Sequence, residues 1–260
     1  MKVGGGRVSE HAPLAVVVGG TSGIGLASAR RLIQDGFEVL VTGRDAQRGH
    51  EAAAELGSHG VVDFVAMDNR RFEDYPRLLD AVAGRPVKAL VVSAAFGVQA
   101  RITDTDAHTF MDMLAVNVAA PLELLKCIAP AMAPPASAIL ISSDAGIEGE
   151  QALGAYSVTK AALNMVGRMA ALDLAERGIR VNVVCPGDTL PGMRYLLRPG
   201  ESERSLQDVN RWPIPPRGRL GQAADTAEMV AFLASPRADF ITGSVVLVDG
   251  GSRAGRPDQR

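Results

Sequence analysis

The chain has 260 residues, 47% of them hydrophobic and 22% charged, a composition typical of a soluble globular protein with one large core. Its formal net charge of -2 gives no electrostatic reason to expect nucleic acid or an anionic membrane as the main partner. Two cysteines are too few for a disulfide framework, and no apolar run reaches the ~18 residues of a membrane span. Residues 1–10 lack the apolar stretch of a signal peptide, so we expect a cytoplasmic protein.

Short apolar runs alternate with helix-like segments along the chain. The expected strands are 14–18, 38–42, 61–65, 87–92, 137–142, 179–184 and 245–248. The expected helices are 23–35, 46–56, 73–83, 105–132 with a kink at Pro121, 155–177 and 223–234. Because such alternation is typical of a parallel sheet with helices on both faces, we predict one α/β domain over residues 1–260.

Three segments are expected to lie outside the regular part of this domain. Residues 1–12 are interpreted as a flexible N-terminus, and residues 253–260 as a tail. Residues 188–221 are rich in proline and charged residues and form a long excursion from the sheet. Long excursions in compact domains are often lids, so we interpret this one as a substrate-binding lid.

The first expected strand runs directly into a glycine-rich turn, Gly19-Gly20-Thr21-Ser22-Gly23-Ile24-Gly25. Glycines where a strand becomes a helix let the backbone approach a pyrophosphate, and the helix N-terminus supplies N–H donors and a favourable dipole. A tight turn also needs glycine, so the glycines alone decide little. Strand, turn and helix together favour a dinucleotide site.

The end of the second expected strand indicates which dinucleotide binds. NAD sites usually place an acid there for the ribose 2′-OH. Here Arg44 follows Gly43, and its guanidinium can bind a 2′-phosphate through a planar fork of donors. We therefore expect NADP as the cofactor. NAD is the alternative, because Asp45 could bind a ribose itself. Asp68 and Asn69 follow the third strand, either beside the adenine or as a turn-forming pair.

Three residues in the second half of the chain form a candidate catalytic group. Ser143 follows the fifth expected strand, Tyr156 comes thirteen residues later, and Lys160 lies four beyond it. Residues i and i+4 share a face of a helix, so the lysine ammonium can lie beside the phenol and favour its ionised form. The tyrosine then becomes usable as a general acid or base, and the serine can hydrogen-bond the substrate oxygen. A Tyr-x-x-x-Lys pair alone is usually a helix-surface pair. The catalytic interpretation therefore depends on its combination with the glycine turn and the upstream serine.

Taken together, these motifs resemble the short-chain dehydrogenase/reductase family, in its single-domain branch of ~250 residues. The resemblance covers residues 13–252. The matching positions are 18–25, Asn117, Ser143, Tyr156, Lys160, Pro186-Gly187, 241–243 and 248–251.

The resemblance implies a fold and a role for each matching residue. The implied fold is a single Rossmann-type, doubly wound, seven-stranded parallel sheet in the order 3-2-1-4-5-6-7, in a homotetramer or a homodimer. Tyr156 would donate the proton in reduction, and Lys160 would bind the nicotinamide ribose. Ser143 would hold the substrate oxygen, and Asn117 would position a water in a proton relay. The cofactor itself would carry the hydride.

The chain departs from the family pattern in two places. The sequence Val92-Ser93-Ala94-Ala95 replaces N-N-A-G after the fourth strand, and Thr189 is the nearest match to a threonine that usually lies where Pro191 stands. The residues expected to bind the cofactor are Gly19, Thr21, Ser22, Gly23, Ile24, Gly25, Arg44, Asp68, Asn69, Ala94, Ala95, Tyr156, Lys160, Pro186, Gly187 and Thr189.

The sequence thus predicts an NADPH-dependent reductase of a ketone, or the same reaction in reverse, with no metal. The alternatives are an NAD-dependent alcohol dehydrogenase, a non-catalytic dinucleotide-binding sensor or scaffold, and a sugar-nucleotide epimerase, for which the chain has little room. The expected pocket wall is 96–101, 144–153 and the lid, with Met193, Tyr195, Leu196, Leu197, Trp212, Arg194, Arg198 and Arg211. Its mixed polarity suits a medium-sized, oxygenated small-molecule substrate.

Overall fold

The computed structural model describes residues 12–191 and 213–255. Most of the predicted N-terminal segment, the greater part of the predicted lid and the end of the predicted tail lie outside these described residues. The same is true of the lining residues expected between positions 193 and 212.

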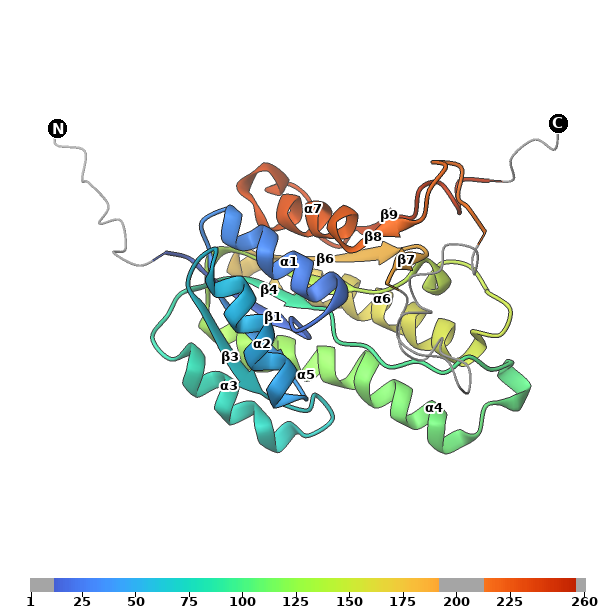
Figure 1. Cartoon of the computed structure of the whole chain (residues 1–260), viewed down its shortest axis with the longest axis horizontal. Helices are drawn as coiled ribbons and strands as arrows, with labels where there is room; N and C mark the ends of the chain where they lie inside the picture. Colours follow the sequence, from blue (N-terminus) through green and yellow to red (C-terminus); the bar gives the residue numbers. More distant parts are fainter. Residues whose placement is uncertain (1–11, 192–212, 256–260) are drawn as a thin grey trace, which may run out of the picture.

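A seven-stranded parallel sheet forms the centre of the molecule (Figure 1). Its strands are β1 Leu14–Val18, β2 Glu38–Gly43, β3 Val62–Ala66, β4 Val87–Val92, β5 Met132–Ile141, β6 Ile179–Pro186 and β9 Val245–Val248. Their order is β3-β2-β1-β4-β5-β6-β9, which confirms the predicted fold class and strand order.

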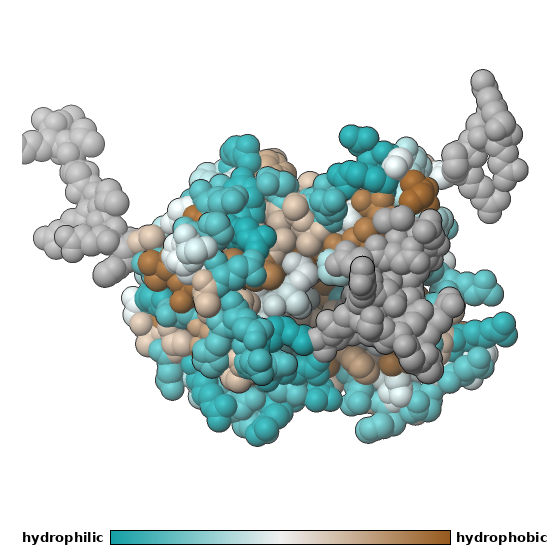
Figure 2. All heavy atoms as spheres, in the orientation of Figure 1, coloured by the Kyte–Doolittle hydropathy of each residue, from teal (hydrophilic) through white to brown (hydrophobic). Residues whose placement is uncertain are grey.

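Helices cover both faces of this sheet. They are α1 Gly23–Gln34, α2 Ala46–Gly57, α3 Tyr75–Val82, α4 Ala107–Leu114, α5 Ala120–Ile128, α6 Gly154–Leu174 and α7 Ala223–Ala234. One face packs on α1, α2 and α7, and the other on α3, α5 and α6. Figure 1 shows α1 and α7 side by side, and Figure 2 shows a mainly hydrophilic outer surface over α2 and α3.

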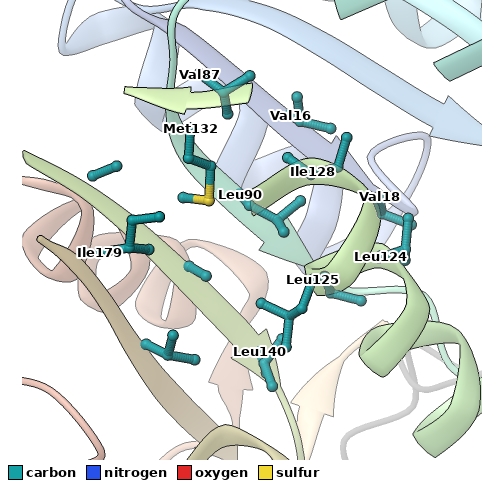
Figure 3. Packing of buried hydrophobic residues seen from close by; sticks show 14 of the residues in the cluster. Val16, Val18, Val87, Leu90, Leu124, Leu125, Ile128, Met132, Leu140 and Ile179 are labelled. Atoms are coloured by element: carbon teal, nitrogen blue, oxygen red, sulfur yellow. The ribbon is translucent and has the colours of Figure 1, made fainter. Parts of the chain in front are cut away.

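The strands are apolar on both faces, as is typical of buried parallel strands, and so contribute to a hydrophobic core on each side of the sheet. In β1, Val16 and Val18 join the cluster under α3, α5 and α6, whereas Val17 joins the cluster under α1 and α7. Side chains alternate between the faces of a strand, so one run of valines serves two cores. Figure 3 shows Leu124 and Ile128 of α5 packed over the first of these clusters.

The predicted long helical stretch over residues 105–132 is confirmed, since a continuous helical segment runs over Ala107–Ala131. The chain forms α4, a π-helical turn over Ala115–Ala119, then α5 and a short 3-10 turn. Pro121 lies in the first turn of α5, directly after the π-helical turn, so the change of helical winding falls beside the proline. Met132 already belongs to β5, because the prolines at 134 and 135 cannot continue a helix.

This helical stretch is also long and apolar enough to pass a test for a membrane span. Within the described residues, the test selects one segment, Ala107–Ala131, with half of its apolar window buried inside the protein. The buried side chains of α5 face the central sheet, and a core helix satisfies the same criterion.

A second, two-stranded parallel sheet joins β7 Thr189–Leu190 to β8 Gly221–Gln222. The sequence did not predict it, because strands of two residues are too short to show an alternating pattern. The small sheet brings the two ends of the predicted lid segment together.

Candidate active site

The residues expected to bind and react lie at one edge of the main sheet. Gly19 follows β1, Arg44 follows β2, Asp68 follows β3, Ala94 follows β4 and Ser143 follows β5. All these strands are parallel, so their carboxyl ends meet at this edge, where open α/β sheets bind ligands.

The glycine turn has room for backbone only. A Cβ on Gly19, whose φ is 78°, would come within 2.7 Å of the Ala94 backbone nitrogen. A Cβ on Gly25 would lie 2.1 Å from the Gly19 carbonyl oxygen. The Ser22 side chain makes no capping hydrogen bond to α1, which leaves the first N–H groups of that helix for an anion. The turn therefore fits a pyrophosphate.

The other predicted residues of this turn take part in packing. Thr21 lies against Gly43, where a Cβ would meet the Thr21 side chain at 2.7 Å. Ile24 packs against the core cluster under α1 and α7. Gly23 has a φ of 51° and opens α1 with no atom near the position of an added Cβ. Thr21 and Ile24 thus anchor the turn, and the exposed backbone is at Gly23.

Around the expected adenosine end, the side chains have different partners. Arg44 is exposed and makes no ion pair within residues 12–191 and 213–255. Asp45 accepts a hydrogen bond from the Arg48 backbone N–H at 3.0 Å and caps α2. The Arg70 guanidinium binds Asp68 at 2.9 Å and lowers the pKa of that carboxyl.

Asn69 is buried, and its carbonyl oxygen accepts a hydrogen bond from the Tyr75 hydroxyl at 3.0 Å. Ala94 and Ala95 are half-buried beside the glycine turn, and Ala94 N–H donates to the Val18 carbonyl at 3.1 Å. The main chain of these residues therefore lies along the carboxyl edge of the sheet, beside the glycine turn.

Asn117 lies in the π-helical turn between α4 and α5 and is 1% exposed. Its Oδ1 accepts from Phe96 N–H at 2.9 Å, and its Nδ2 donates to the Phe96 carbonyl at 2.7 Å. Nδ2 also donates to Thr159 Oγ1 at 2.9 Å. The asparagine thereby ties the segment after β4 to α6, and π-helical turns of this kind are frequent at functional sites.

Tyr156 and Lys160 lie one turn apart on α6, and both are buried. Lys160 Nζ lies 5.5 Å from the centre of the Tyr156 ring and donates to the Ile141 carbonyl at 3.0 Å. Burial lowers the pKa of Lys160 to about 8. Tyr156 packs in a small apolar cluster with Met113 and Leu153. A phenol and an amine are therefore held together in a dry environment.

Ser143 precedes a 3-10 turn over Asp144–Gly146 and caps it. Its Oγ accepts from Ala145 N–H at 3.2 Å and donates to Asp144 Oδ1 at 3.2 Å. The same turn packs tightly on α6, because a Cβ on Gly146 would lie 2.7 Å from the carbonyl carbon of Lys160. The structure thus brings Ser143, Lys160 and, through α6, Tyr156 to one place.

The expected nicotinamide end lies after β6. Gly187 N–H donates to the Val248 carbonyl, and a Cβ on Gly187 would lie 2.9 Å from Asp249 Cβ. Pro186 is buried as the last residue of β6, and Thr189 Oγ1 donates to the Gly187 carbonyl at 2.8 Å. A groove of about 390 Å³ opens beside the glycine turn, lined by Gly23, Leu26, Ala27, Arg30, Leu190, Pro191 and 222–224.

Sequence reasoning missed a set of charged residues beside Ser143. Arg253, which was assigned to a tail, makes ion pairs with Asp144, Glu148 and Glu150. Burial and the nearby carboxylates raise the pKa of Asp188 to about 6. No periodic signal could have indicated the contacts of Arg253, although the three carboxylates that it binds, Asp144, Glu148 and Glu150, were expected to line the pocket. The described residues contain no cluster of three or more His, Cys, Asp or Glu side chains suited to a metal ion.

This constellation on a parallel sheet agrees with comparisons to known proteins. A family model described as enoyl-(acyl carrier protein) reductase matches residues 18–253. The NADP-dependent (R)-specific alcohol dehydrogenase of Lentilactobacillus kefiri is 33% identical over 252 residues, 93% of this chain and 96% of that protein. The chain belongs to the short-chain dehydrogenase/reductase family.

Other members of the family are similar over nearly the whole chain. Human dehydrogenase/reductase SDR family member 4 is 34% identical over 92% of this chain and 87% of its own. A solved structure described as a short chain dehydrogenase/reductase family protein is 37% identical, with a TM-score of 0.82, and the match covers 94% of this chain and 98% of that one. A solved structure of a putative betaketoacyl-ACP reductase is 35% identical, with a TM-score of 0.79 and the same coverage. As a short-chain dehydrogenase/reductase, the chain is an oxidoreductase of the CH–OH/C=O couple that uses NAD(P).

Proposed function

We propose that this short-chain dehydrogenase/reductase reduces a ketone to a secondary alcohol with NADPH, or catalyses the reverse reaction, and that Tyr156 is its general acid and base. The observation that carries the proposal is the buried pair of Tyr156 and Lys160, 5.5 Å from ring centre to Nζ, at the carboxyl edge of the sheet. A lysine is rarely buried without a task, because burial of its charge is costly.

The proposed reaction gives a role to each of four residues, Asn117, Ser143, Tyr156 and Lys160. The bound nicotinamide supplies the hydride. Tyr156 donates its hydroxyl proton to the substrate oxygen, and the Lys160 ammonium favours the phenolate that remains. Ser143 Oγ–H donates a hydrogen bond to the same oxygen as negative charge develops there. Asn117 holds the segment at Phe96 against α6 and positions a water that returns the proton.

NADP is the proposed cofactor because Arg44 is exposed directly after β2 and makes no ion pair within residues 12–191 and 213–255; its charge contributes to the lowered pKa of Asp68. Its guanidinium is therefore available for a 2′-phosphate. The similar alcohol dehydrogenase of L. kefiri is NADP-dependent by its name. Arg44→Ala should raise the KM for NADPH by about tenfold or more, the value of one charge-assisted hydrogen bond, and leave the KM for NADH nearly unchanged. Equal effects on both cofactors would contradict the assignment.

The reaction itself is tested by following NADPH oxidation at 340 nm with a panel of ketones that includes cyclohexanone, acetophenone and ethyl acetoacetate. Tyr156→Phe should bind NADPH normally in a fluorescence titration and lose at least about a hundredfold in kcat, in line with the usual contribution of general acid catalysis. Turnover that persists in this variant would overturn the mechanism. Absence of turnover with every ketone, and with the matching alcohols and NADP⁺, would overturn the proposed reaction.

We also propose a homotetramer in the cytoplasm. Large apolar side chains on α4 and α6 are exposed in the single chain, among them Met111, Met165 and Leu172, and Phe240 before β9 is fully exposed. Apolar surface of this kind on a soluble domain marks an interaction site. Light scattering coupled to size exclusion should give four times the 27.2 kDa chain mass, and a monomer would contradict the proposal. Cell fractionation tests the location, and recovery in the membrane fraction would contradict it.

A further inference from the structure

Arg253 lies at the centre of three carboxylates beside the proposed substrate site. Its Nε donates to Asp144 Oδ2 at 3.1 Å, its Nη1 to Glu148 Oε2 at 3.4 Å and its Nη2 to Glu150 Oε2 at 3.1 Å. The arginine side chain is 19% exposed. A guanidinium offers several donors in fixed directions, so one arginine can hold three acids in a defined arrangement.

The backbone of Arg253 is held as firmly as its side chain. Its N–H donates to Asp249 Oδ2 at 2.8 Å, and Gly251 N–H donates to Asp249 Oδ1 at 2.9 Å. Asp249 directly follows β9 and packs against Gly187 at the end of β6. The guanidinium is therefore held by the segment that follows β9, and Arg253, which was predicted to begin a tail, lies beside Ser143 instead.

The Asp144 carboxylate connects this arginine to the serine of the candidate catalytic group. Its Oδ2 accepts from Arg253, while its Oδ1 accepts from Ser143 Oγ–H at 3.2 Å and from Ala145 N–H at 2.9 Å. Asp144 is 8% exposed, so little water competes for these bonds. The Ser143 hydroxyl thus has two alternative acceptors during turnover, this carboxylate and the substrate oxygen.

The surroundings of Asp144 make Arg253 important for the local charge. Burial raises the pKa of Glu150 and, more strongly, that of Asp188, whereas the Arg253 cation lowers both. The titratable and charged groups that interact with Asp144 are Glu150 on its own loop, Cys185 in β6, Asp188 after β6 and Arg253 after β9. Glu148 shares the Arg253 guanidinium with Asp144, and Lys160 on α6 acts on Cys185. Without Arg253, the carboxylates would repel one another in a half-buried space.

We propose that Arg253 is a positioning residue that acts through Asp144 on the direction of the Ser143 hydroxyl. The hydrogen bond from Arg253 draws electron density from the Asp144 carboxylate and holds it in place, which makes it a weaker acceptor for the serine. The serine hydroxyl can then turn to the substrate oxygen as that oxygen becomes negative. This inference rests on the proposed role of Ser143 in ketone reduction.

The test uses full-length Arg253→Gln, Asp144→Asn and the double variant, with NADPH and whichever panel ketone the unaltered protein reduces fastest. Arg253→Gln should lower kcat by about tenfold, the value of one hydrogen bond lost from the transition state, and leave the KM for NADPH unchanged. The loss should be largest above pH 7 and smaller near pH 5, where Glu150 and Asp188, whose pKa values burial already raises, take up protons. The double variant should recover to within about threefold of Asp144→Asn alone, because the competing acceptor is then neutral.

Arg85 provides the matched control at the opposite edge of the sheet. It also bridges two carboxylates, Glu38 at 3.7 Å and Asp63 at 2.7 Å, and its side chain is 25% exposed. Arg85→Gln should therefore leave kcat and its pH profile unchanged. Thermal unfolding gives a second measurement, which needs no substrate. Between pH 4 and pH 7, the melting temperature of Arg253→Gln should fall more steeply with rising pH than that of the unaltered protein. Adding Asp144→Asn to this variant should make the fall less steep.

Two results would overturn the inference. The first is that Arg253→Gln changes neither kcat nor the pH dependence of unfolding. The second is that Arg253→Gln lowers kcat equally in the protein that also carries Asp144→Asn, as expected of a purely structural contact. If Tyr156→Phe abolishes activity while Arg253→Gln is normal, only this inference fails. If Tyr156→Phe remains active, the proposed function fails, and the slopes of unfolding still decide whether Arg253 and Asp144 are coupled.

Discussion

Replacement of Lys160 by methionine should stabilise the protein while it removes activity. The lysine is 1% exposed, and burial lowers its pKa from 10.5 to about 8. The folded state therefore binds this proton less tightly than the unfolded chain does. Below pH 8 the charged lysine opposes folding by its full amount, and this penalty disappears as pH rises from about 8 to 10.5. Methionine has a similar length and no charge to bury.

The magnitude follows from the same pKa values. The gap between 10.5 and about 8 corresponds to about 3 kcal/mol, because each pKa unit is worth about 1.4 kcal/mol. Against this gain, the Ile141 carbonyl loses the donor that it has at 3.0 Å, which costs about 1 kcal/mol. We therefore expect Lys160→Met to raise the free energy of unfolding by about 2 kcal/mol at pH 7.

Urea-induced unfolding of the cofactor-free protein at one fixed protein concentration measures this difference. The advantage of Lys160→Met should shrink and reach zero or below between pH 7 and pH 10.5. Lys88→Met is the matched control, because Lys88 Nζ also donates to a backbone carbonyl, that of Pro134 at 3.1 Å, but from the surface. Its effect should stay within about 1 kcal/mol at every pH. A Lys160→Met variant that is less stable at pH 7, or whose advantage does not change with pH, would refute the reasoning.

Three further outcomes are expected. Asn117→Ala should lower the free energy of unfolding by about 3 kcal/mol in urea, because it removes three hydrogen bonds from a residue that is 1% exposed. Gly25→Ala should weaken NADPH binding by at least about tenfold in a fluorescence titration, because an added Cβ would lie 2.1 Å from the Gly19 carbonyl oxygen and shift the anion-binding turn. Gly57→Ala, with no atom within 4 Å of the added Cβ, should leave binding unchanged. Asp188→Asn should raise the melting temperature at pH 7 but not at pH 4, since an acid with its pKa raised to about 6 opposes folding only once it ionises.

The central sheet could be predicted from the sequence because its strands have a strong local signal. Leu14–Val18 is apolar throughout and bounded by Pro13 and Gly19, and the structure has this strand with the same limits. The helix Ala223–Ala234 and the strand Val245–Val248 also match the predicted limits. Glycine turns and apolar runs are local patterns of neighbouring residues, so they can be recognised in a single sequence.

The parts that could not be predicted depend on partners far away in the chain. Arg253 binds Asp144 across 109 positions, and no spacing rule relates an arginine near the end of the chain to a loop after the fifth strand. The π-helical turn around Asn117 also escaped prediction, because its wider winding leaves the apolar pattern of the helical stretch nearly unchanged. The proposed role of Ser143 follows from the motif, whereas Asp144, whose carboxylate accepts the hydrogen bond of Ser143 Oγ–H, was expected only as part of the pocket wall.

The small sheet formed by β7 and β8 has a consequence for how new specificities could be installed in this scaffold. Thr189 pairs with Gly221 and Leu190 pairs with Gln222, so positions 189–190 and 221–222 are held together at one fixed junction. The entropy of closing a loop grows slowly, by about 0.6 kcal/mol for each doubling of its length. We therefore expect that segments of different length can be grafted between these two strands while the main sheet and the proposed catalytic residues stay in place. For the lid predicted over residues 188–221, this junction is the position at which a library of segments should be exchanged.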